Sequence, residues 1–217
     1  VATDQMVDTP TNNFCTLNAV FDERTSGTET FSEGNLEWTN TSAGSAAVSV
    51  GTIGVTGKIY FEGVATTLGG EPIIGFGRDD KTNAQLGPGH NSNAGTFIYE
   101  LSSGKFYNGA AEDTGPSTAS AGDIISVAYD TTSGKVWFAT NGTWYNSGDP
   151  AAGTNASFTI SSSFKDILVP LVGGLNSPVW VLNFGSDSSF AGNKTAQGNQ
   201  DSNEVGDFYY APPTDYL

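Results

Sequence analysis

The stretch that decides the fold is Gly122–Asp149, GDIISVAYDTTSGKVWFATNGTWYNSGD. Its first part alternates, so that Ile125, Val127 and Tyr129 fall on one face, and a period of two is typical of a half-buried strand. A polar loop closed by glycine follows, and then a segment rich in aromatic and β-branched residues. The dipeptide Asn141-Gly142 comes next, which is the strongest two-residue hairpin signal. The stretch therefore predicts a three-stranded antiparallel meander.

The composition of the whole chain is consistent with this meander. The 217 residues include 28 Gly, 13 Phe, 8 Tyr and 4 Trp, a mixture typical of many short strands joined by tight turns. Turn signals recur at short intervals, and we expect about ten to thirteen strands and no helix. The sequence thus predicts one all-β domain, a sandwich of two antiparallel sheets with long loops.

Charge limits the classes of partner. The chain carries 23 acidic and 8 basic residues, a net charge of −15, and the basic residues form no local run. A surface that binds phosphate needs clustered positive charge, which argues against nucleic acid and against anionic lipid. No apolar run approaches the ~18 residues of a membrane-spanning helix, and we expect neither membrane insertion nor a signal peptide. Cys15 is the single cysteine, so we expect a small buried residue and no intrachain disulfide.

Three segments are expected along the chain. Residues 1–29 are a polar N-terminal arm and lead-in, residues 30–185 carry the strands, and residues 186–217 are an extension rich in Gly, Asn and Asp. Aromatic residues at 208–210 interrupt this polar extension, and we expect them to pin it onto the sandwich. Trp137 and Trp180 lie within predicted strands and are expected in the core.

The decisive stretch resembles the core signature of the SPRY (B30.2-like) domain family. Upstream, GKIYFEGV (57–64) and IIGFGR (73–78) resemble the preceding family strands, and VLNFG (181–185) resembles the closing strand, all in family order. Ser126 stands where the family usually has Gly, and Ile59 where an aromatic residue is frequent. The resemblance implies a concanavalin-like bent sandwich, not an enzyme, that binds partners through loops. The matching signature positions are Gly122, Asp123, Ile125, Asp130, Gly134, Phe138, Asn141 and Gly142.

Other segments resemble the SPRY-type regions of tailed-bacteriophage virion proteins. These are DTPTNNFCTLNAV (8–20), TFSEGNLEW (30–38), WYNSGDPAAGTN (144–155) and the C-terminal stretch that begins at NFGSDSSF (183–217). This resemblance implies a structural protein on the virion surface, extracellular when released: a tail fibre, a receptor-binding protein or a capsid decoration. Neighbouring virion subunits would be its partners, in a homo-oligomer, together with a host receptor or glycan. The alternative is a cellular or secreted SPRY-type adaptor that binds a protein or a glycan.

The family analogy selects the loops 79–95, 108–121 and 150–155 as candidate binding loops, and aromatic residues near predicted loops or strand ends are further candidates. Exposed aromatic side chains are common platforms for sugars and for protein partners. Long polar loops are often functional, although the only histidine has no neighbours at the spacing of a metal site or a catalytic triad. The candidates are Tyr99, Tyr107, Trp144, Tyr145, Asp79, Asp80 and His90.

Sequence signatures of catalysis are absent, since the chain has no G-x-S-x-G, P-loop, HExxH or Cys/His cluster. Adjacent carboxylates such as Asp79 and Asp80 cannot flank one glycosidic bond. We therefore expect neither enzymatic activity nor a resident cofactor. Oxygen ligands gather at Asp201, Asn203 and Asp207, which would suit Ca²⁺ but lack the order of an EF-hand loop. A loop of Asx turns is the alternative.

Overall fold

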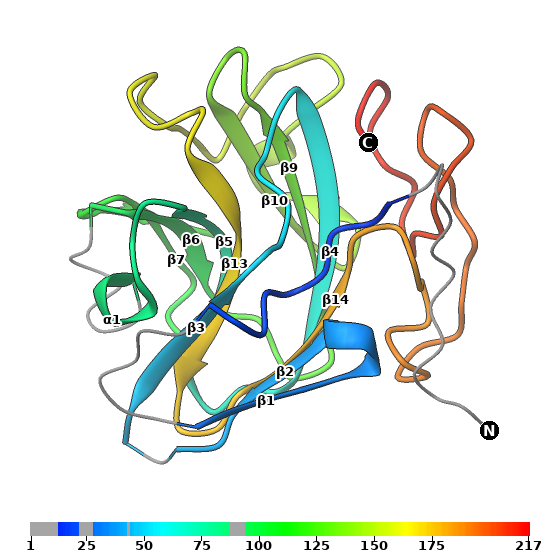
Figure 1. Ribbon diagram of the computed structural model, residues 1–217. Helices are drawn as coiled ribbons and strands as arrows, with labels where there is room; N and C mark the ends of the chain where they lie inside the picture. Colours follow the sequence, from blue (N-terminus) through cyan, green and yellow to red (C-terminus); the bar gives the residue numbers. More distant parts are fainter. Residues whose placement is uncertain (1–12, 22–27, 43, 87–93) are drawn as a thin grey trace.

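The computed structural model describes residues 13–21, 28–42, 44–86 and 94–217. Two antiparallel sheets pack face to face in these residues, as Figure 1 shows, and the all-β sandwich predicted from the sequence is confirmed. The described residues form fourteen strands, one more than expected, and one helical turn, α1 (Asn83–Leu86). The expectation of no helix is therefore wrong at this turn. There the N–H of Leu86 donates to the carbonyl of Thr82, 3.0 Å away, and the Leu86 side chain is buried.

The larger sheet has the strand order β1-β2-β14-β4-β9-β10-β11, and β12 also pairs with β10. All its ladders are antiparallel, so that strands far apart in the chain lie side by side. Its strands are β1 (Glu29–Ser32), β2 (Glu37–Asn40), β4 (Lys58–Thr67), β9 (Ile124–Asp130), β10 (Lys135–Thr140), β11 (Thr143–Trp144), β12 (Phe158–Thr159) and β14 (Val179–Asn183).

The smaller sheet has the order β3-β13-β5-β6-β7-β8 and is also antiparallel. Its strands are β3 (Ala46–Val50), β5 (Gly70–Arg78), β6 (Thr96–Glu100), β7 (Lys105–Asn108), β8 (Ala111–Thr114) and β13 (Leu168–Leu175). Short 3₁₀ turns, η1 (Glu33–Asn35) and η3 (Tyr145–Ser147), follow β1 and β11.

The predicted meander is β9, β10 and β11, and the side chain of Asn141 holds its turn together. Asn141 and Gly142 have φ values of 49° and 76°, the left-handed geometry of a tight hairpin. The Asn141 Oδ1 accepts the backbone N–H of Ile124 at 2.9 Å, and its Nδ2 donates to Asp123 Oδ1 at 2.8 Å. The Gly-Asp at the start of the stretch and the Asn-Gly near its end are thus two halves of one hydrogen-bonded unit.

The main core lies between the two sheets. Ile125, Val127 and Tyr129 face it together, as the alternation predicted, and the opposite sheet contributes Phe76 and Phe106. Ring centroids in this core lie 5.0–6.0 Å apart, for example 5.0 Å between Phe76 and Tyr129. Such aromatic pairs add about 0.5–1.5 kcal/mol each beyond the burial of their area.

The outer faces of both sheets are covered as well. On the smaller sheet, Ile73, Ile98 and Leu171 form a buried cluster with Leu86 of α1. On the larger sheet, the C-terminal extension (orange to red in Figure 1) runs along the side of β4 and β14 away from the smaller sheet. Phe208 in this extension is buried beside Tyr60 of β4, and Tyr209 and Tyr210 pack partly buried against a second cluster on the same face.

The two tryptophans expected in the core are both buried, but on opposite faces of the larger sheet. Trp180 lies between the sheets, whereas Trp137 belongs to the outer cluster beneath the loop that follows η3. Cys15 is a free, half-buried thiol rather than a fully buried one. In the part of the chain that the structure describes, no helix has the length and apolar character needed to cross a membrane.

Candidate functional site

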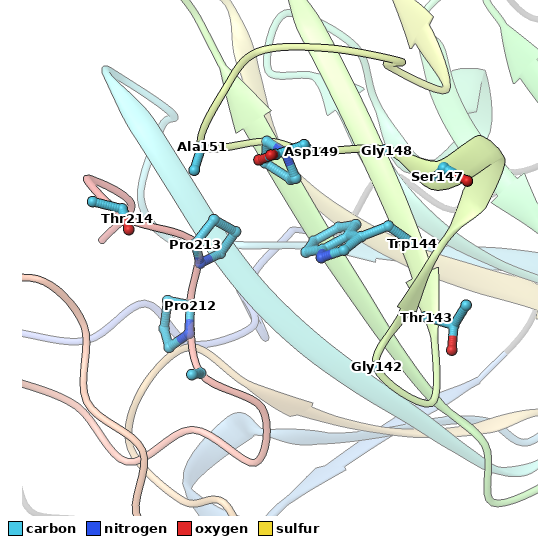
Figure 2. Close-up of a pocket in the computed structure, with 12 residues that line it drawn as sticks. Gly142, Thr143, Trp144, Ser147, Gly148, Asp149, Ala151, Pro212, Pro213 and Thr214 are labelled. Atoms are coloured by element: carbon cyan, nitrogen blue, oxygen red, sulfur yellow. The ribbon is translucent and has the colours of Figure 1, made fainter.

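An open groove of about 720 Å³ lies on the outer side of the larger sheet, and we refer to it as the Trp144 groove. Figure 2 shows Trp144 and Asp149 on one side of it and Pro212 and Pro213 on the other. One wall comes from residues 142–144 and 147–151, and the other from residues 211–214. The groove therefore joins the end of the decisive stretch to the C-terminal extension.

The first wall begins where the chain reverses after β11. Asn146 and Ser147 in η3 have φ values of 54° and 53°, so the backbone turns sharply there. Tyr145 points inward, with its hydroxyl donating to the Thr114 carbonyl at 3.1 Å and its ring 5.1 Å from that of Phe106. Because Tyr145 is fixed inward, its neighbour Trp144 stays on the opposite side, beside the groove (Figure 2).

The loop after η3 is held against β10 by two side-chain hydrogen bonds and is closed by a backbone pair of its own. The Trp137 Nε1 donates to the carbonyl of Thr154 at 2.8 Å, and the Lys135 Nζ donates to that of Gly153 at 2.7 Å. Asp149 and Thr154 exchange two backbone hydrogen bonds at 3.1 and 3.0 Å. These contacts hold the first wall of the groove in one conformation.

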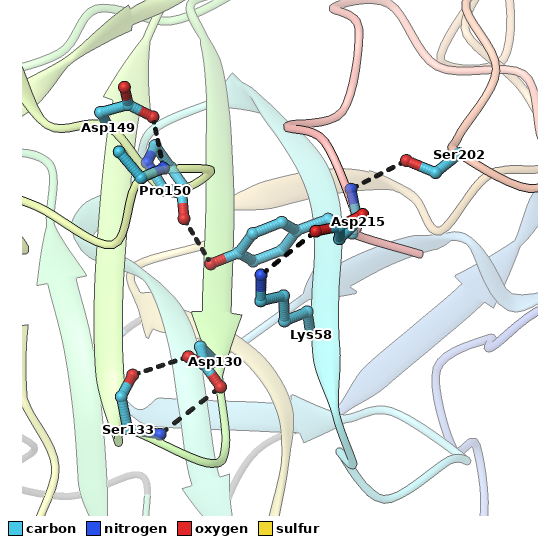
Figure 3. A network of polar contacts seen from close by, with 9 residues as sticks. Lys58, Asp130, Ser133, Asp149, Pro150, Ser202 and Asp215 are labelled. Atoms are coloured by element: carbon cyan, nitrogen blue, oxygen red, sulfur yellow. Dashed lines mark hydrogen bonds and ion pairs between the residues drawn. The ribbon is translucent and has the colours of Figure 1, made fainter.

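The second wall is anchored just beyond it, at the end of the extension. The buried Tyr216 donates its hydroxyl to the Pro150 carbonyl at 3.3 Å, which ties the two walls together. The Asp215 carboxylate lies 3.7 Å from Lys58 Nζ, and its backbone N–H donates to the Ser202 hydroxyl at 2.8 Å (Figure 3). Burial raises the pKa of Tyr216, so this hydroxyl stays protonated as a donor.

The indole of Trp144 differs from those of the other three tryptophans in its hydrogen bonding. Trp38, Trp137 and Trp180 donate their Nε1–H to protein oxygens at 2.9, 2.8 and 3.0 Å. Among the described residues, no protein oxygen accepts the Trp144 Nε1–H. This nitrogen is also not among the buried side-chain atoms that lack a hydrogen-bond partner. The Trp144 and Tyr60 rings meet edge to face, with their centroids 6.5 Å apart. Trp144 is thus held in place while its N–H remains available to a ligand.

The charge of the groove restricts what it can hold. Asp149 is the only ionisable side chain in the lining, which contains no Lys or Arg. The lining also holds three hydroxyl groups and the rings of three prolines, from Thr143, Ser147, Thr214, Pro150, Pro212 and Pro213. A phosphate or sulfate group would find no cation here, so a neutral or basic ligand fits this chemistry.

Two of the candidate aromatic residues lie elsewhere than expected. Tyr99 is completely buried between the sheets and donates its hydroxyl to the Ser117 carbonyl at 2.9 Å. Tyr107 is 4% exposed, in the cluster on the outer face of the smaller sheet. The expectation that these two rings sit exposed near loops is wrong, because their strands are covered on both faces. Of the four candidate aromatics, Trp144 lines the groove and Tyr145 supports it from behind.

The other candidates of the 79–95 loop do not join the groove. Asp79 and Asp80 are exposed after β5, and the Asp80 carboxylate pairs with the Arg78 guanidinium at 2.5 Å. Hydrogen bonding from this guanidinium lowers the pKa of Asp80. His90 lies outside the described residues.

The candidate Ca²⁺ ligands are arranged as a polar loop. The Asp201 Oδ1 accepts the backbone N–H groups of Asn203 and Val205 at 2.8 and 3.1 Å, which makes an Asx turn. The Asp207 N–H donates to the Gly185 carbonyl at 2.8 Å, and its buried Oδ1 has no hydrogen-bond partner. In the described ranges, no three His, Cys, Asp or Glu side chains gather as a metal-binding group. The arrangement thus gives no support to Ca²⁺ binding, which stays a prediction from the sequence alone.

The second wall of the groove was not anticipated from the sequence. Pro212 and Pro213 follow the pinning aromatics, and no local pattern places them opposite Trp144. Asp149 ends the decisive stretch, and no motif there marks it as a binding residue. The only advance signal was Trp144 itself, an aromatic residue at a strand end beside an Asn-Gly turn.

Comparisons with known proteins agree with the geometry of the fold. The SPRY domain sequence profile matches residues 58–173, which are 116 of the 217 residues. No curated protein sequence matches the chain. Among solved structures, the chain is similar to the SPRY domain of human HERC1, with a TM-score of 0.54 and 18% identity. That likeness covers 68% of this chain and 87% of the other, and it shows the shared fold. From the profile match over more than half its length, the chain belongs to the SPRY domain family.

Proposed function

We propose that this chain is a non-enzymatic binding module that holds an extended segment of a partner protein in the Trp144 groove. The observation that carries this proposal is the free indole N–H of Trp144 in an open groove lined by proline and small polar residues. Support also comes from the family, because SPRY domains generally act as protein-binding modules rather than as catalysts.

An extended polypeptide suits this lining for two reasons. Its backbone presents carbonyl oxygens at regular intervals, and an indole N–H is a good donor to them. Its side chains can pack against the faces of Trp144, Pro212 and Pro213, as aromatic grooves receive extended peptides elsewhere.

The charge of the chain and of the groove further restricts the class of partner segment. The chain has a net charge of −15, and Asp149 is the one ionisable group in the groove. A segment with lysine or arginine, or a neutral one rich in proline, therefore fits better than an acidic one, and electrostatic attraction would speed its association at low salt.

The test is a selection of displayed random peptides on the immobilised protein, with counter-selection on Trp144→Ala. We expect peptides that bind the wild type at least tenfold more tightly than Trp144→Ala, since losing a central aromatic anchor costs about 2 kcal/mol or more. Trp144→Phe is the matched control, because it keeps an aromatic face while it loses the N–H and part of the indole area.

The outcomes separate the classes of partner. Selected peptides that shift the backbone amide signals of residues 142–151 and 211–214 would support the proposal. Peptides that bind Trp144→Ala as well as wild type would refute the groove as the site. Binding of neutral glycans on an array, abolished by Trp144→Ala while no peptide is recovered, would make the partner a saccharide and overturn the protein-binding proposal.

For its setting, we propose a bacteriophage particle, where neighbouring subunits or a host receptor would supply the partner. This part rests on the sequence resemblance of residues 8–20, 30–38, 144–155 and 183–217 alone. Cryo-electron microscopy of the source particle tests it. Density for a sandwich of this size on a tail appendage or on the capsid lattice would support the proposal, whereas absence from the particle would favour the cellular adaptor.

A further inference from the structure

The extension that forms the second wall lies outside the part of the chain that matches the SPRY family, residues 58–173. Its position over the larger sheet must therefore be set by contacts with the domain itself. The contact that stands out chemically is Glu62, a completely buried carboxylate on the outer face of β4.

Glu62 receives two successive backbone N–H groups of the extension. Its Oε2 accepts the N–H of Tyr209 and its Oε1 that of Tyr210, both at 2.8 Å. From the sheet, the Tyr60 hydroxyl donates to Oε1 at 2.8 Å and Asn183 Nδ2 donates to Oε2 at 3.3 Å. Each oxygen thus accepts one bond from the extension and one from the sheet.

These donors carry no formal charge, so Glu62 is not half of a buried ion pair. A buried carboxylate without a cation is costly unless hydrogen bonds satisfy it, and four donors do so here. Asn183 completes the junction, because its Nδ2 also donates to the Asp207 carbonyl at 2.8 Å. The carboxylate and the amide together hold the extension at residues 207–210.

The groove wall begins directly after the clamped residues. Ala211 follows Tyr210, and the next two residues, Pro212 and Pro213, have φ fixed by their rings. The two prolines reduce the backbone freedom of residues 211–214, so we expect a displacement at Tyr210 to reach this wall. From these contacts we infer that Glu62 is a positioning residue for the Trp144 groove, clamping the backbone at Tyr209 and Tyr210 to set its second wall. The inference rests on the proposed function for the meaning of the groove, but the clamp itself can be tested without a ligand.

The groups that face Glu62 determine how it titrates. They are Tyr60 from its own strand, Ser126 from β9 through the Tyr60 hydroxyl at 3.0 Å, Asn183 from β14, and Tyr209 and Tyr210 from the extension. Burial raises the pKa of Glu62, while the N–H groups of Tyr210 and Tyr209 act in the opposite direction.

Amide hydrogen exchange in the full chain tests the clamp directly. Glu62→Gln preserves shape but turns an NH₂ group toward N–H donors, so we expect the amides of Tyr209, Tyr210 and Ala211 to exchange about tenfold faster or more. Glu37→Gln is the matched control, a half-buried glutamate on β2 of the same sheet that does not contact the extension. It should leave exchange in the extension unchanged.

A spectroscopic signature separates positioning from general stability. In wild type, the amide proton shifts of Tyr209 and Tyr210 should titrate together with one midpoint above 4.5, the ordinary value for Glu, and in Glu62→Gln this step should be gone. Tyr60→Phe removes one hydrogen-bond donor to Glu62 and keeps the ring. It is the second test variant if Glu62→Gln fails to fold. It should raise exchange at Tyr210 about two- to fivefold.

Each outcome decides a separate claim. Unchanged exchange at Tyr209 and Tyr210 in Glu62→Gln, or in Tyr60→Phe if only that variant folds, would overturn the clamp. Faster exchange together with at least tenfold weaker binding of a peptide selected on wild type would support the inference. Faster exchange with unchanged peptide binding would overturn the positioning role. If the selected peptide binds Trp144→Ala as tightly as wild type, the proposed function is refuted, whereas the clamp at Glu62 is not.

Discussion

Replacing Asn141 by alanine should destabilise the chain through three separable losses. The Ile124 N–H loses its acceptor at 2.9 Å, and Asp123 loses a donor at 2.8 Å. Alanine must also adopt a φ of 49°, in the left-handed region that disfavours residues other than Gly, Asn and Asp.

The magnitude follows from these three terms. The Ile124 N–H is only partly buried, so water can replace its partner and the cost falls at the low end of the range, about 1 kcal/mol. The exposed bond to Asp123 is worth about 0.5–1 kcal/mol. The left-handed backbone adds about 1 kcal/mol. Together they predict about 3 kcal/mol for Asn141→Ala, and about 2 kcal/mol for Asn141→Gly, which tolerates the backbone.

Urea denaturation followed by tryptophan fluorescence measures these differences. The chain offers a matched control in Asn146, which has a φ of 54° but no side-chain hydrogen bond among the described residues. Asn146→Ala should therefore cost about 1 kcal/mol, the backbone term alone. If Asn141→Ala stays within about 0.5 kcal/mol of wild type, or costs no more than Asn146→Ala, the account of this turn is wrong.

Three further variants test the fold and the wall. Gly75→Ala would place a Cβ 2.3 Å from the Phe97 carbonyl oxygen at a φ of 151°, so we expect a loss of about 3 kcal/mol or more in calorimetry; a normal melting temperature would refute this. Trp137→Phe removes the bond to Thr154, and amide exchange in residues 149–154 should rise about fivefold, with no change at residues 101–104. For Asp130, burial raises the pKa but bonds from Ser133 and Thr132 outweigh it, and the net pKa is lowered from 3.8. Its ionised form thus stabilises the fold above pH 3.8, so Asp130→Asn should be less stable than wild type at pH 6, and this gap should close as pH falls below 3.8; a gap independent of pH would contradict it.

Much of the fold was predictable from local pattern because strand alternation and turn chemistry are local properties. Ile125, Val127 and Tyr129 share the inner face, and the Asn-Gly turn stands where the sequence placed it. Tyr99 and Tyr107 were misjudged for a physical reason. Their sheet is covered on both faces, so nearness to a strand end no longer implies exposure.

Only one wall of the Trp144 groove could be predicted from the sequence. Trp144 carried a local signal, but Pro213 lies 69 positions further along the chain and meets it only through the tertiary fold. The alternation of residues in β4 puts Tyr60 and Glu62 on one face of the strand, but it does not show that this face is covered. The extension that covers it follows the last strand, so strand periodicity could not place it.

The central claim is that Trp144 presents a free donor to a partner in a preformed groove, and the indole N–H signals measure it most directly. In an ¹H–¹⁵N spectrum of the free protein, we expect three indole signals protected from exchange, from Trp38, Trp137 and Trp180, and one fast-exchanging signal that disappears in Trp144→Phe. Adding a peptide selected on wild type should shift that fourth signal downfield and slow its exchange at least tenfold. A fourth signal already protected in the free protein, or one untouched by the bound peptide, would contradict the account.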